Sequence, residues 1–287
     1  MLSRNLSPSI IYLVCMSFIS AAKTVLITGC SRGIGAGLVK ASLAEPCTFV
    51  IATCRSPETA TELQKIAKGY AEDRLVILPL DTTSLDSYKN AVESLTSKGI
   101  NSIDILIANA GISNPDHPAD PVLTCSEKTM MDVFKTNCVG TLLTLQTFTP
   151  FLQKGSTKLC VLLSSRLASI EQAEGVGGYT SYRASKAAMN MLAMTYSEDS
   201  TVKEANIRTL CMHPGWVQTD MGERGGRKAS VSVVDCVEGI RSMMNRASSV
   251  QAIIEKGEED TSTEAFETSL RNHRVVFTAY DGEMLPW

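Results

Sequence analysis

Short runs of apolar and β-branched residues recur along the chain, and longer segments with helical periodicity lie between most of them. Continuous apolar runs predict strands that are covered on both faces, as in a parallel sheet. Strands that alternate with helices predict a single-domain α/β fold, a doubly wound parallel sheet of about seven strands with helices on both faces. The predicted strands are Val25–Ile27, Thr48–Thr53, Leu75–Leu80, Ile103–Ala108, Leu159–Leu163, Ile207–Met212 and Val275–Tyr280, and the clearest predicted helices are Ser126–Leu152, Tyr179–Glu198 and Ser230–Asn245.

The first predicted strand leads directly into a glycine-rich turn, "TVLITGCSRGIG", with Gly29, Gly33 and Gly35. Packing alone gives no evident reason for three glycines here. Glycine lets another group approach the backbone closely, and the first turn of the following helix offers unpaired N–H donors and a positive dipole end. The turn therefore predicts a seat for a phosphate or pyrophosphate, with a plain tight turn as the alternative.

Polar or glycine-containing segments also follow the second to sixth predicted strands. Ligands on parallel sheets bind beyond the carboxyl ends of the strands, so these segments are candidates for the functional site. They are Arg55, Asp81, Asn109-Ala110-Gly111, Ser164-Ser165 and Pro214-Gly215.

The segment "YTSYRASKAAMN" places Tyr182 and Lys186 four residues apart. On a helix these two side chains share one face. A free tyrosine has a pKa of about 10, and a neighbouring ammonium favours the phenolate and lowers that value. The pair therefore predicts a general acid/base, although an isolated Tyr and Lys at this spacing are more often plain surface residues.

Composition narrows the classes of partner. The net charge of -3 argues against a nucleic-acid-binding surface and favours small molecules. Nine cysteines without C-x-x-C pairs indicate reduced, buried thiols, and Cys54, Cys138, Cys160 and Cys211 lie in or beside apolar segments. The three histidines show no metal-ligand spacing, so no metal site is expected.

Residues 1–22 form an apolar N-terminal extension ahead of the domain, which is predicted to span residues 23–287. Arg4, the apolar run Ile10–Ile19 and Ser20-Ala21-Ala22 together resemble a secretory signal peptide. The run is too short to span a membrane comfortably, and the many unpaired cysteines favour a cytoplasmic protein. The secretory pathway is the alternative.

Five motifs occur in the order and positions of the short-chain dehydrogenases/reductases. They are Thr28–Gly35, which resembles T-G-x-x-x-G-x-G, the "ANAG" at Ala108–Gly111, "LLSSRLAS", the Y-x-x-x-K pair and "HPGWVQTDM". The resemblance covers about residues 23–287 and is closest to the sniffer-type carbonyl reductases and the bacterial C-factor proteins. It implies a Rossmann-type fold and an oxidoreductase that transfers a hydride from NADPH to a carbonyl substrate.

The resemblance also implies the catalytic roles. Tyr182 would protonate the carbonyl oxygen, Lys186 would hold the ribose hydroxyls and lower the pKa of the tyrosine, and Ser165 would hydrogen-bond the substrate oxygen. Asn137 resembles the asparagine that supports a water relay to the lysine. Ser169 is the alternative to Ser165, because it lies nearer the usual spacing before the tyrosine, whereas Ser165 stands at the strand end.

Cofactor contacts follow from the same resemblance. An acidic residue that would select NAD is absent from the end of the second predicted strand, where Arg55 stands instead, and Arg32 lies in the glycine turn. Two guanidinium groups predict a clamp for the 2′-phosphate of NADP. The expected cofactor-binding residues are Gly29, Ser31, Arg32, Gly33, Ile34, Gly35, Arg55, Asp81, Asn109, Ala110, Gly111, Tyr182, Lys186, Pro214, Gly215, Val217 and Thr219.

The family resemblance further implies a homodimer or homotetramer. Trp216, Gly222–Ala229 and Gly257–Arg271 are expected to shape or cover the substrate site. Two other functions stay open: a non-catalytic dinucleotide-binding sensor on the same fold, and an enzyme that oxidises an alcohol with NAD.

Overall fold

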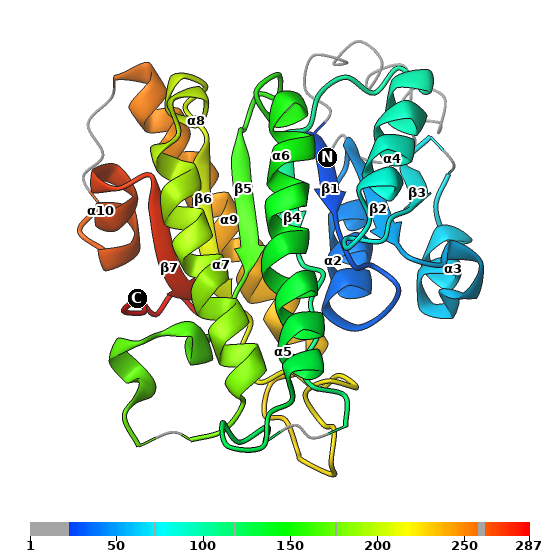
Figure 1. The fold of residues 1–287 in the computed structure, drawn as a ribbon. Coiled ribbons are helices and arrows are strands. Elements are labelled where there is room, and N and C mark those ends of the chain that lie inside the picture. The colour runs from blue at the N-terminus through cyan, green and yellow to red at the C-terminus, as the bar shows by residue number, and fades with distance from the viewer. Residues whose placement is uncertain (1–22, 72, 117–118, 176, 258–261) are drawn as a thin grey trace, which may run out of the picture.

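The computed structural model describes residues 23–287 except 72, 117–118, 176 and 258–261. Its centre is a seven-stranded sheet in the order β3-β2-β1-β4-β5-β6-β7 with every neighbouring pair parallel (Figure 1). The strands are β1 (Lys23–Ile27), β2 (Thr48–Cys54), β3 (Leu75–Pro79), β4 (Ile105–Ala108), β5 (Leu159–Leu163), β6 (Arg208–His213) and β7 (Val275–Ala279). All seven predicted strands are confirmed, with ends shifted by one or two residues. The predicted N-terminal extension lies outside the described residues.

Helices cover both faces of the sheet, as predicted. Alternate residues of β1 show the division: Val25 and Ile27 pack in the core under α2, α9 and α10, whereas Leu26 packs in the core under α4, α6 and α7. The helices are α2 (Gly33–Ala44), α3 (Thr61–Ala67), α4 (Leu85–Ser97), α5 (Glu127–Phe134), α6 (Gly140–Leu152), α7 (Thr180–Glu198), α8 (Ser200–Glu204), α9 (Val233–Lys256) and α10 (Ala265–Asn272). In the part of the chain that is described, no helix is long and apolar enough to cross a bilayer.

Two of the three predicted helices differ from the prediction. The segment predicted as one helix over Ser126–Leu152 is α5 and α6 joined by a π-helical turn, Lys135–Val139. Helix α9 continues beyond the predicted end at Asn245 to Lys256, because Val250 and Gln251 of its polar second half are buried. The Gln251 side chain accepts a hydrogen bond of 2.8 Å from Arg208, which is itself buried at the start of β6.

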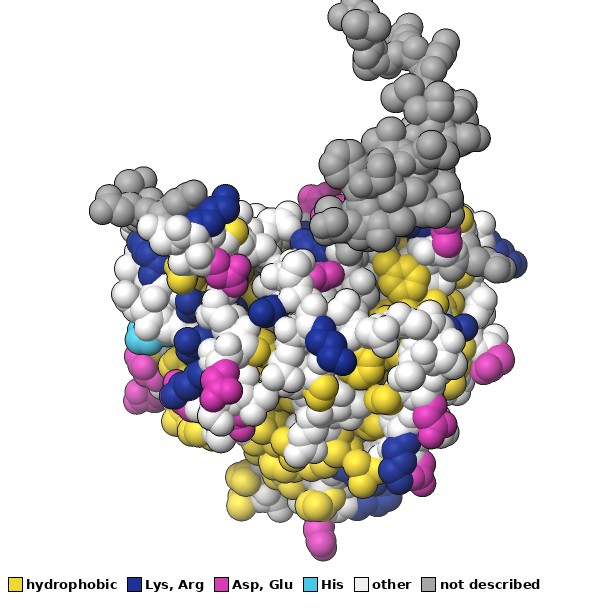
Figure 2. Space-filling model, turned by 90° about the horizontal axis from the view of Figure 1, so that it is seen from above, with side chains coloured by type: hydrophobic (Ala, Val, Ile, Leu, Met, Phe, Trp, Pro, Cys, Tyr) yellow, Lys and Arg dark blue, Asp and Glu magenta, His cyan; other side chains and the backbone are white. Residues whose placement is uncertain are grey.

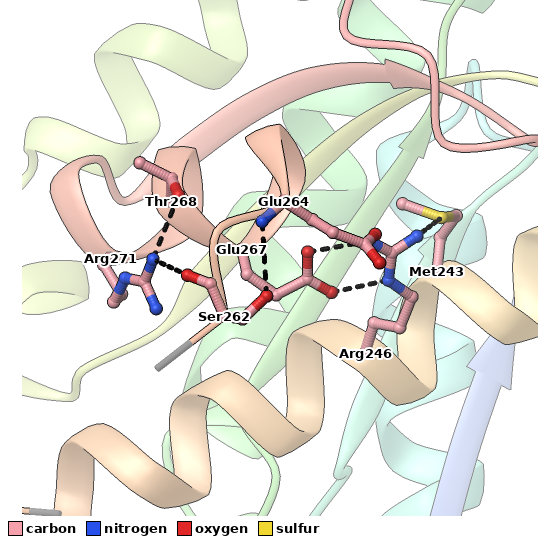
Figure 3. A network of polar contacts seen from close by, with 7 residues as sticks. All are labelled: Met243, Arg246, Ser262, Glu264, Glu267, Thr268 and Arg271. Atoms are coloured by element: carbon pink, nitrogen blue, oxygen red, sulfur yellow. Dashed lines mark hydrogen bonds and ion pairs between the residues drawn. The ribbon is translucent and has the colours of Figure 1, made fainter. Parts of the chain in front are cut away.

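The segment expected to cover the substrate site at Gly257–Arg271 lies elsewhere. Its described part carries α10, which packs on α9 and β7 (Figure 1), and none of its residues lines the cavity described below. Arg246 of α9 holds it in place through Glu264 and Glu267 (Figure 3). That expectation was wrong for the described part of the segment, because a paired charge network fastens it to α9 beside the edge strand β7.

The methionines beside the Tyr–Lys pair divide between the core and the surface. Met189 is fully buried, whereas Met191 and Met194 of α7 and Met131 of α5 are exposed. Helices α6 and α7 lie on the side that faces the viewer of Figure 1. This side forms the lower edge of Figure 2, where hydrophobic side chains gather. This face leaves exposed apolar side chains that another subunit could cover, and the homo-oligomer itself stays a prediction.

Candidate active site

A cavity of about 1180 Å³ opens beyond the carboxyl ends of the strands, where the order of the sheet reverses between β1 and β4. The structure brings together in its lining every predicted site residue except Asn137. These lining residues are Gly29, Ser31, Arg32, Gly33, Ile34, Gly35, Arg55, Asp81, Asn109, Ala110, Gly111, Ser165, Tyr182, Lys186, Pro214, Gly215, Val217 and Thr219. One concave site thus gathers motifs that are spread over nearly 200 positions of the sequence.

Two glycines of the first turn are required by packing, contrary to the expectation from sequence. A Cβ added to Gly35 would lie 2.2 Å from the Gly29 carbonyl oxygen, and one added to Gly29 would lie 2.8 Å from the Ala110 Cα. Both distances are shorter than real Cβ contacts, so any larger residue would push the ends of β1 and β4 apart. Gly33 differs, because its neighbour is the flexible end of Thr219 at 3.2 Å and its φ of +61° favours glycine.

Asn109 locks the same junction through its side chain and backbone. Its amide nitrogen donates to the Thr28 and Gly29 carbonyls at 2.9 and 3.0 Å, and its backbone N–H donates to the Thr28 hydroxyl at 3.1 Å. Asn109 therefore ties the end of β1 to the end of β4.

The first turn of α2 fits an anionic ligand. No side chain caps this helix, and the N–H groups of Ile34 and Gly35 have no partner among the described residues. The Gly33 N–H donates to the Glu62 carboxylate at 3.2 Å, so an oxygen anion already occupies part of the seat. The donors that a dinucleotide phosphate requires are thus present and face the cavity.

Tyr182 and Lys186 lie on one face of α7, as their spacing predicts. The Lys186 Nζ lies 5.8 Å from the centre of the Tyr182 ring and donates to the Leu163 carbonyl at 2.6 Å. A Cβ on Gly111 would lie 3.4 Å from this Nζ and 3.2 Å from Asn137 Oδ1, so the small residue at 111 leaves space beside the lysine.

The pKa of Tyr182 differs from the sequence-based expectation. Burial raises it above its ordinary value of 10.0, and the hydrogen bond with Ser165 offsets only part of that rise. Burial also lowers the pKa of Lys186 to about 8. The lysine is 3% exposed, its Nζ donates to the Leu163 carbonyl, and its charge is not among the causes that shift the pKa of Tyr182, so burial shifts both groups toward their neutral forms.

Asn137 is fully buried in the π-helical turn between α5 and α6, outside the cavity lining. Its amide oxygen accepts from the Ile112 N–H at 2.8 Å, and its nitrogen donates to the Ile112 carbonyl and to the Ser185 hydroxyl. Asn137 thus fixes the segment after β4 against α7. The predicted water relay stays a prediction.

The two candidate serines lie in different places. Ser165 follows β5 and lines the cavity, and its hydroxyl lowers the pKa of Tyr182. Ser169 is buried away from the cavity, where its hydroxyl donates to the Trp287 carbonyl at 3.3 Å and accepts from the Gln172 N–H. The geometry favours Ser165 for contact with a substrate.

Arg32 and Arg55 both line the cavity near the end of β2. Arg32 forms an ion pair of 2.8 Å with Asp220, in which both side chains are about 70% exposed. Exposed pairs contribute little, so Arg32 can exchange this partner for another anion. Burial by itself would raise the pKa of Asp81, but hydrogen bonds from Thr83 and the charges of Arg55 and Lys135 lower it overall.

Sequence reasoning missed the way α7 begins. The first turn of α7 carries Tyr182. The residue that precedes the helix, Tyr179, has a φ of +54° and provides no side-chain cap. The carboxylate of Asp120, from the loop after β4, accepts hydrogen bonds from the backbone N–H and hydroxyl of Ser181 instead. A cap supplied from 61 positions away has no signature in the local sequence.

Two arginines of the loop after β6 were also missed as individual residues. Arg224 and Arg227 line the cavity, within the segment Gly222–Ala229 that was expected to shape the substrate site. The guanidinium of Arg227 lies 5.7 Å from the Tyr179 ring and 6.0 Å from the Trp216 ring. In the sequence, the positive charge of these arginines is the signal that could have pointed to them, and it does not distinguish them from surface arginines.

A sequence profile described as short chain dehydrogenase matches residues 23–229. The chain belongs to the short-chain dehydrogenase family. The short-chain dehydrogenase RED3 of Pyricularia oryzae is 30% identical over 276 residues, which are 93% of this chain and 100% of that protein. The similarity therefore extends through the whole of the domain that the fold defines.

Two solved structures of carbonyl reductases have a similar fold. The NADPH-bound carbonyl reductase from chicken fatty liver is 32% identical with a TM-score of 0.75, and the match covers 93% of this chain and 99% of that one. The carbonyl reductase Sniffer of D. melanogaster is 28% identical with a TM-score of 0.74, and the match covers 93% and 100% of the two chains. The likeness to sniffer-type carbonyl reductases expected from the motifs is confirmed.

The two serines can be separated by single substitutions. We expect Ser165→Ala to lower the turnover of a carbonyl substrate about 100-fold, the usual cost of removing a hydroxyl that binds a reacting oxygen. Ser169→Ala is the matched control and should lower the free energy of unfolding by about 1 kcal/mol while turnover stays near that of the wild type. Steady-state kinetics and chemical denaturation check both. The reverse pattern would assign the role to Ser169.

Proposed function

We propose that this short-chain dehydrogenase is an NADPH-dependent carbonyl reductase. The observation that carries the proposal is the meeting of Tyr182, Ser165 and Lys186 in the same cavity as the glycine turn and its unpaired N–H donors. The similarity to an NADPH-bound carbonyl reductase supports both the reaction class and the cofactor.

The cofactor, when bound, supplies the hydride. Tyr182 donates the proton to the carbonyl oxygen, and its high pKa keeps the phenol protonated and ready to donate. Ser165, whose hydroxyl acts on the pKa of Tyr182, holds the same oxygen in position. Lys186 lies one turn along α7 and binds the ribose hydroxyls.

On the cofactor side, we assign the first turn of α2 to the pyrophosphate and Asp81 to the adenine. Arg32 and Arg55 bind the 2′-phosphate of NADPH, with Arg32 leaving Asp220 to do so. Asn109, Ala110 and Gly111 line the adenosine half, and Thr219 contacts the nicotinamide carboxamide or the pyrophosphate. Cytoplasmic location and the homodimeric or homotetrameric state remain predictions.

Two alternatives make different demands. A non-catalytic sensor would bind NADPH yet leave every aldehyde, quinone and diketone of a broad panel unreduced. An enzyme of the family that oxidises an alcohol with NAD would prefer that cofactor to NADP. The complete set of Tyr182, Lys186, Ser165 and Asn137 favours an enzyme over a sensor, and the two arginines favour NADPH over NAD.

The central experiment is a turnover screen with NADPH and this carbonyl panel, repeated for Tyr182→Phe. The substitution removes only the ionisable oxygen, so we expect turnover to fall at least about 100-fold while NADPH affinity is nearly unchanged. Absorbance at the NADPH band measures turnover, and fluorescence titration measures binding. Retention of most activity by Tyr182→Phe would contradict the assignment.

Cofactor binding should depend on pH through Lys186. Its pKa of about 8 in the free protein means that the amine loses its charge as pH rises through that value. If only the ammonium form binds, the dissociation constant of NADPH should rise about tenfold between pH 7 and pH 9. Fluorescence titrations across this range measure the effect. In Lys186→Met the affinity should be weaker and the step near pH 8 absent; an unchanged step would assign it to another group.

Cofactor preference should depend on the arginine pair. Each charged hydrogen bond contributes about 1.5 to 3 kcal/mol, so loss of both should reduce the NADPH preference by roughly two orders of magnitude or more. The measurement is kcat/KM for NADPH and NADH in wild type and Arg32→Ala/Arg55→Ala. Lys40→Ala, an exposed cation of α2 outside the cavity, is the control. A wild-type preference for NADH, or an unchanged ratio in the double variant, would refute the clamp.

A further inference from the structure

The part of the cavity beyond Tyr182 is built differently from the part around the glycine turn. It is bounded by the loop after β4, the start of α7 and the loop after β6, drawn in yellow below the sheet in Figure 1. Its lining includes Ile112, Leu167, Tyr179, Trp216, Arg224 and Arg227. This region combines apolar and aromatic surface with two guanidinium groups.

Both guanidinium groups have only neutral partners. Arg224 donates through Nη1 to the Ser113 hydroxyl at 3.2 Å and to the Asn114 carbonyl at 3.0 Å. Arg227 donates to the Tyr179 hydroxyl at 2.8 Å and to the carbonyls of Arg224 and Met221. Among the residues that the structure describes, no carboxylate lies within 4.0 Å of either group.

The acidic residues of the cavity are engaged elsewhere. Asp220, in the same loop as the two arginines, pairs with Arg32, and Asp132 pairs with Lys128. Glu62 accepts from the first turn of α2, and Asp81 accepts from Thr83. Arg166, which also lines the cavity, differs from Arg224 and Arg227 because Glu283 neutralises it.

Two positive charges without counterions are therefore half-buried in one part of the cavity of a chain whose net charge is -3. Partial burial weakens solvent screening, so an anionic group that enters this region gains more than it would at an open surface. The Nε and Nη2 groups of Arg224 have no acceptor in the described protein, which leaves two adjacent donors for a carboxylate.

We infer that the substrate is an aromatic aldehyde or ketone that carries a carboxylate, with the carboxylate bound by Arg224 beside Arg227 and the ring placed against Trp216. The Trp216 ring is 44% exposed and offers a flat apolar surface next to these charges. The inference rests on the proposed carbonyl reduction. The carbonyl carbon takes the hydride, its oxygen takes the proton of Tyr182, and the carboxylate passes through the reaction unchanged.

The test uses para-substituted benzaldehydes that differ in charge: 4-carboxybenzaldehyde, its neutral methyl ester and the cationic 4-trimethylammonio analogue. In the wild type, kcat/KM should be highest for the carboxylate and lowest for the cation, and the advantage of the carboxylate over the ester should shrink with added salt. Arg224→Gln should reduce that advantage at least tenfold, and Arg224→Lys should restore a large part of it. Lys228→Gln, an exposed cation of the same loop outside the cavity, should leave the ratio unchanged.

The outcomes separate this inference from the function on which it rests. Reduction of the ester and the carboxylate with equal efficiency in wild type and Arg224→Gln would overturn the carboxylate site and leave the reductase intact. If none of the three aldehydes is reduced although NADPH still binds, the proposed reductase activity is wrong for this substrate class, and the inference is wrong with it. A tenfold loss of NADPH affinity in Arg224→Gln, without a change in substrate ratio, would assign the arginine to the cofactor and overturn the substrate role.

Discussion

The close approach of backbone to backbone at the ends of β1 and β4 is the constraint on which the site depends. Gly29 lies against Ala110, Gly35 lies against the Gly29 carbonyl, and the Asn109 amide bridges the two strand ends. Side chains at these glycines would move α2 away from the sheet. The junction therefore fixes where α2 begins. The unpaired N–H groups of the first turn of α2 consequently face the cavity.

Burial sets the electrostatics of the catalytic pair. Burial raises the pKa of Tyr182 and lowers that of Lys186. The charged form of each side chain is therefore less stable in the protein than it would be in water. A proton held on a phenol of high pKa is available to a carbonyl oxygen whose negative charge develops during reduction. The pKa of Tyr182 is thus set by burial and by Ser165, and not by the ammonium charge that the family resemblance assigns to it.

The sequence allowed the sheet and most of the site to be predicted, because the apolar strands and the motifs at their ends are local patterns. The extent of α9 was underestimated, since Gln251 is buried through a hydrogen bond to Arg208 in another element. The π-helical turn that contains Asn137 was also missed, because the apolar positions on both sides of it follow one helical pattern. Asp120 and Arg224 act through partners that only the folded chain brings near, so no spacing rule could have identified them.

The borrowed cap of α7 has a consequence for motion. Because Asp120 caps the first turn of α7 in place of the N-cap residue, loss of this contact would leave the Ser181 N–H without its side-chain acceptor and lower the local stability of the turn. The general acid lies within that turn, and Arg224 fastens the loop after β6 to the same loop. The turn that carries Tyr182 is therefore connected, through Asp120 and Arg224, to both loops whose residues line the cavity.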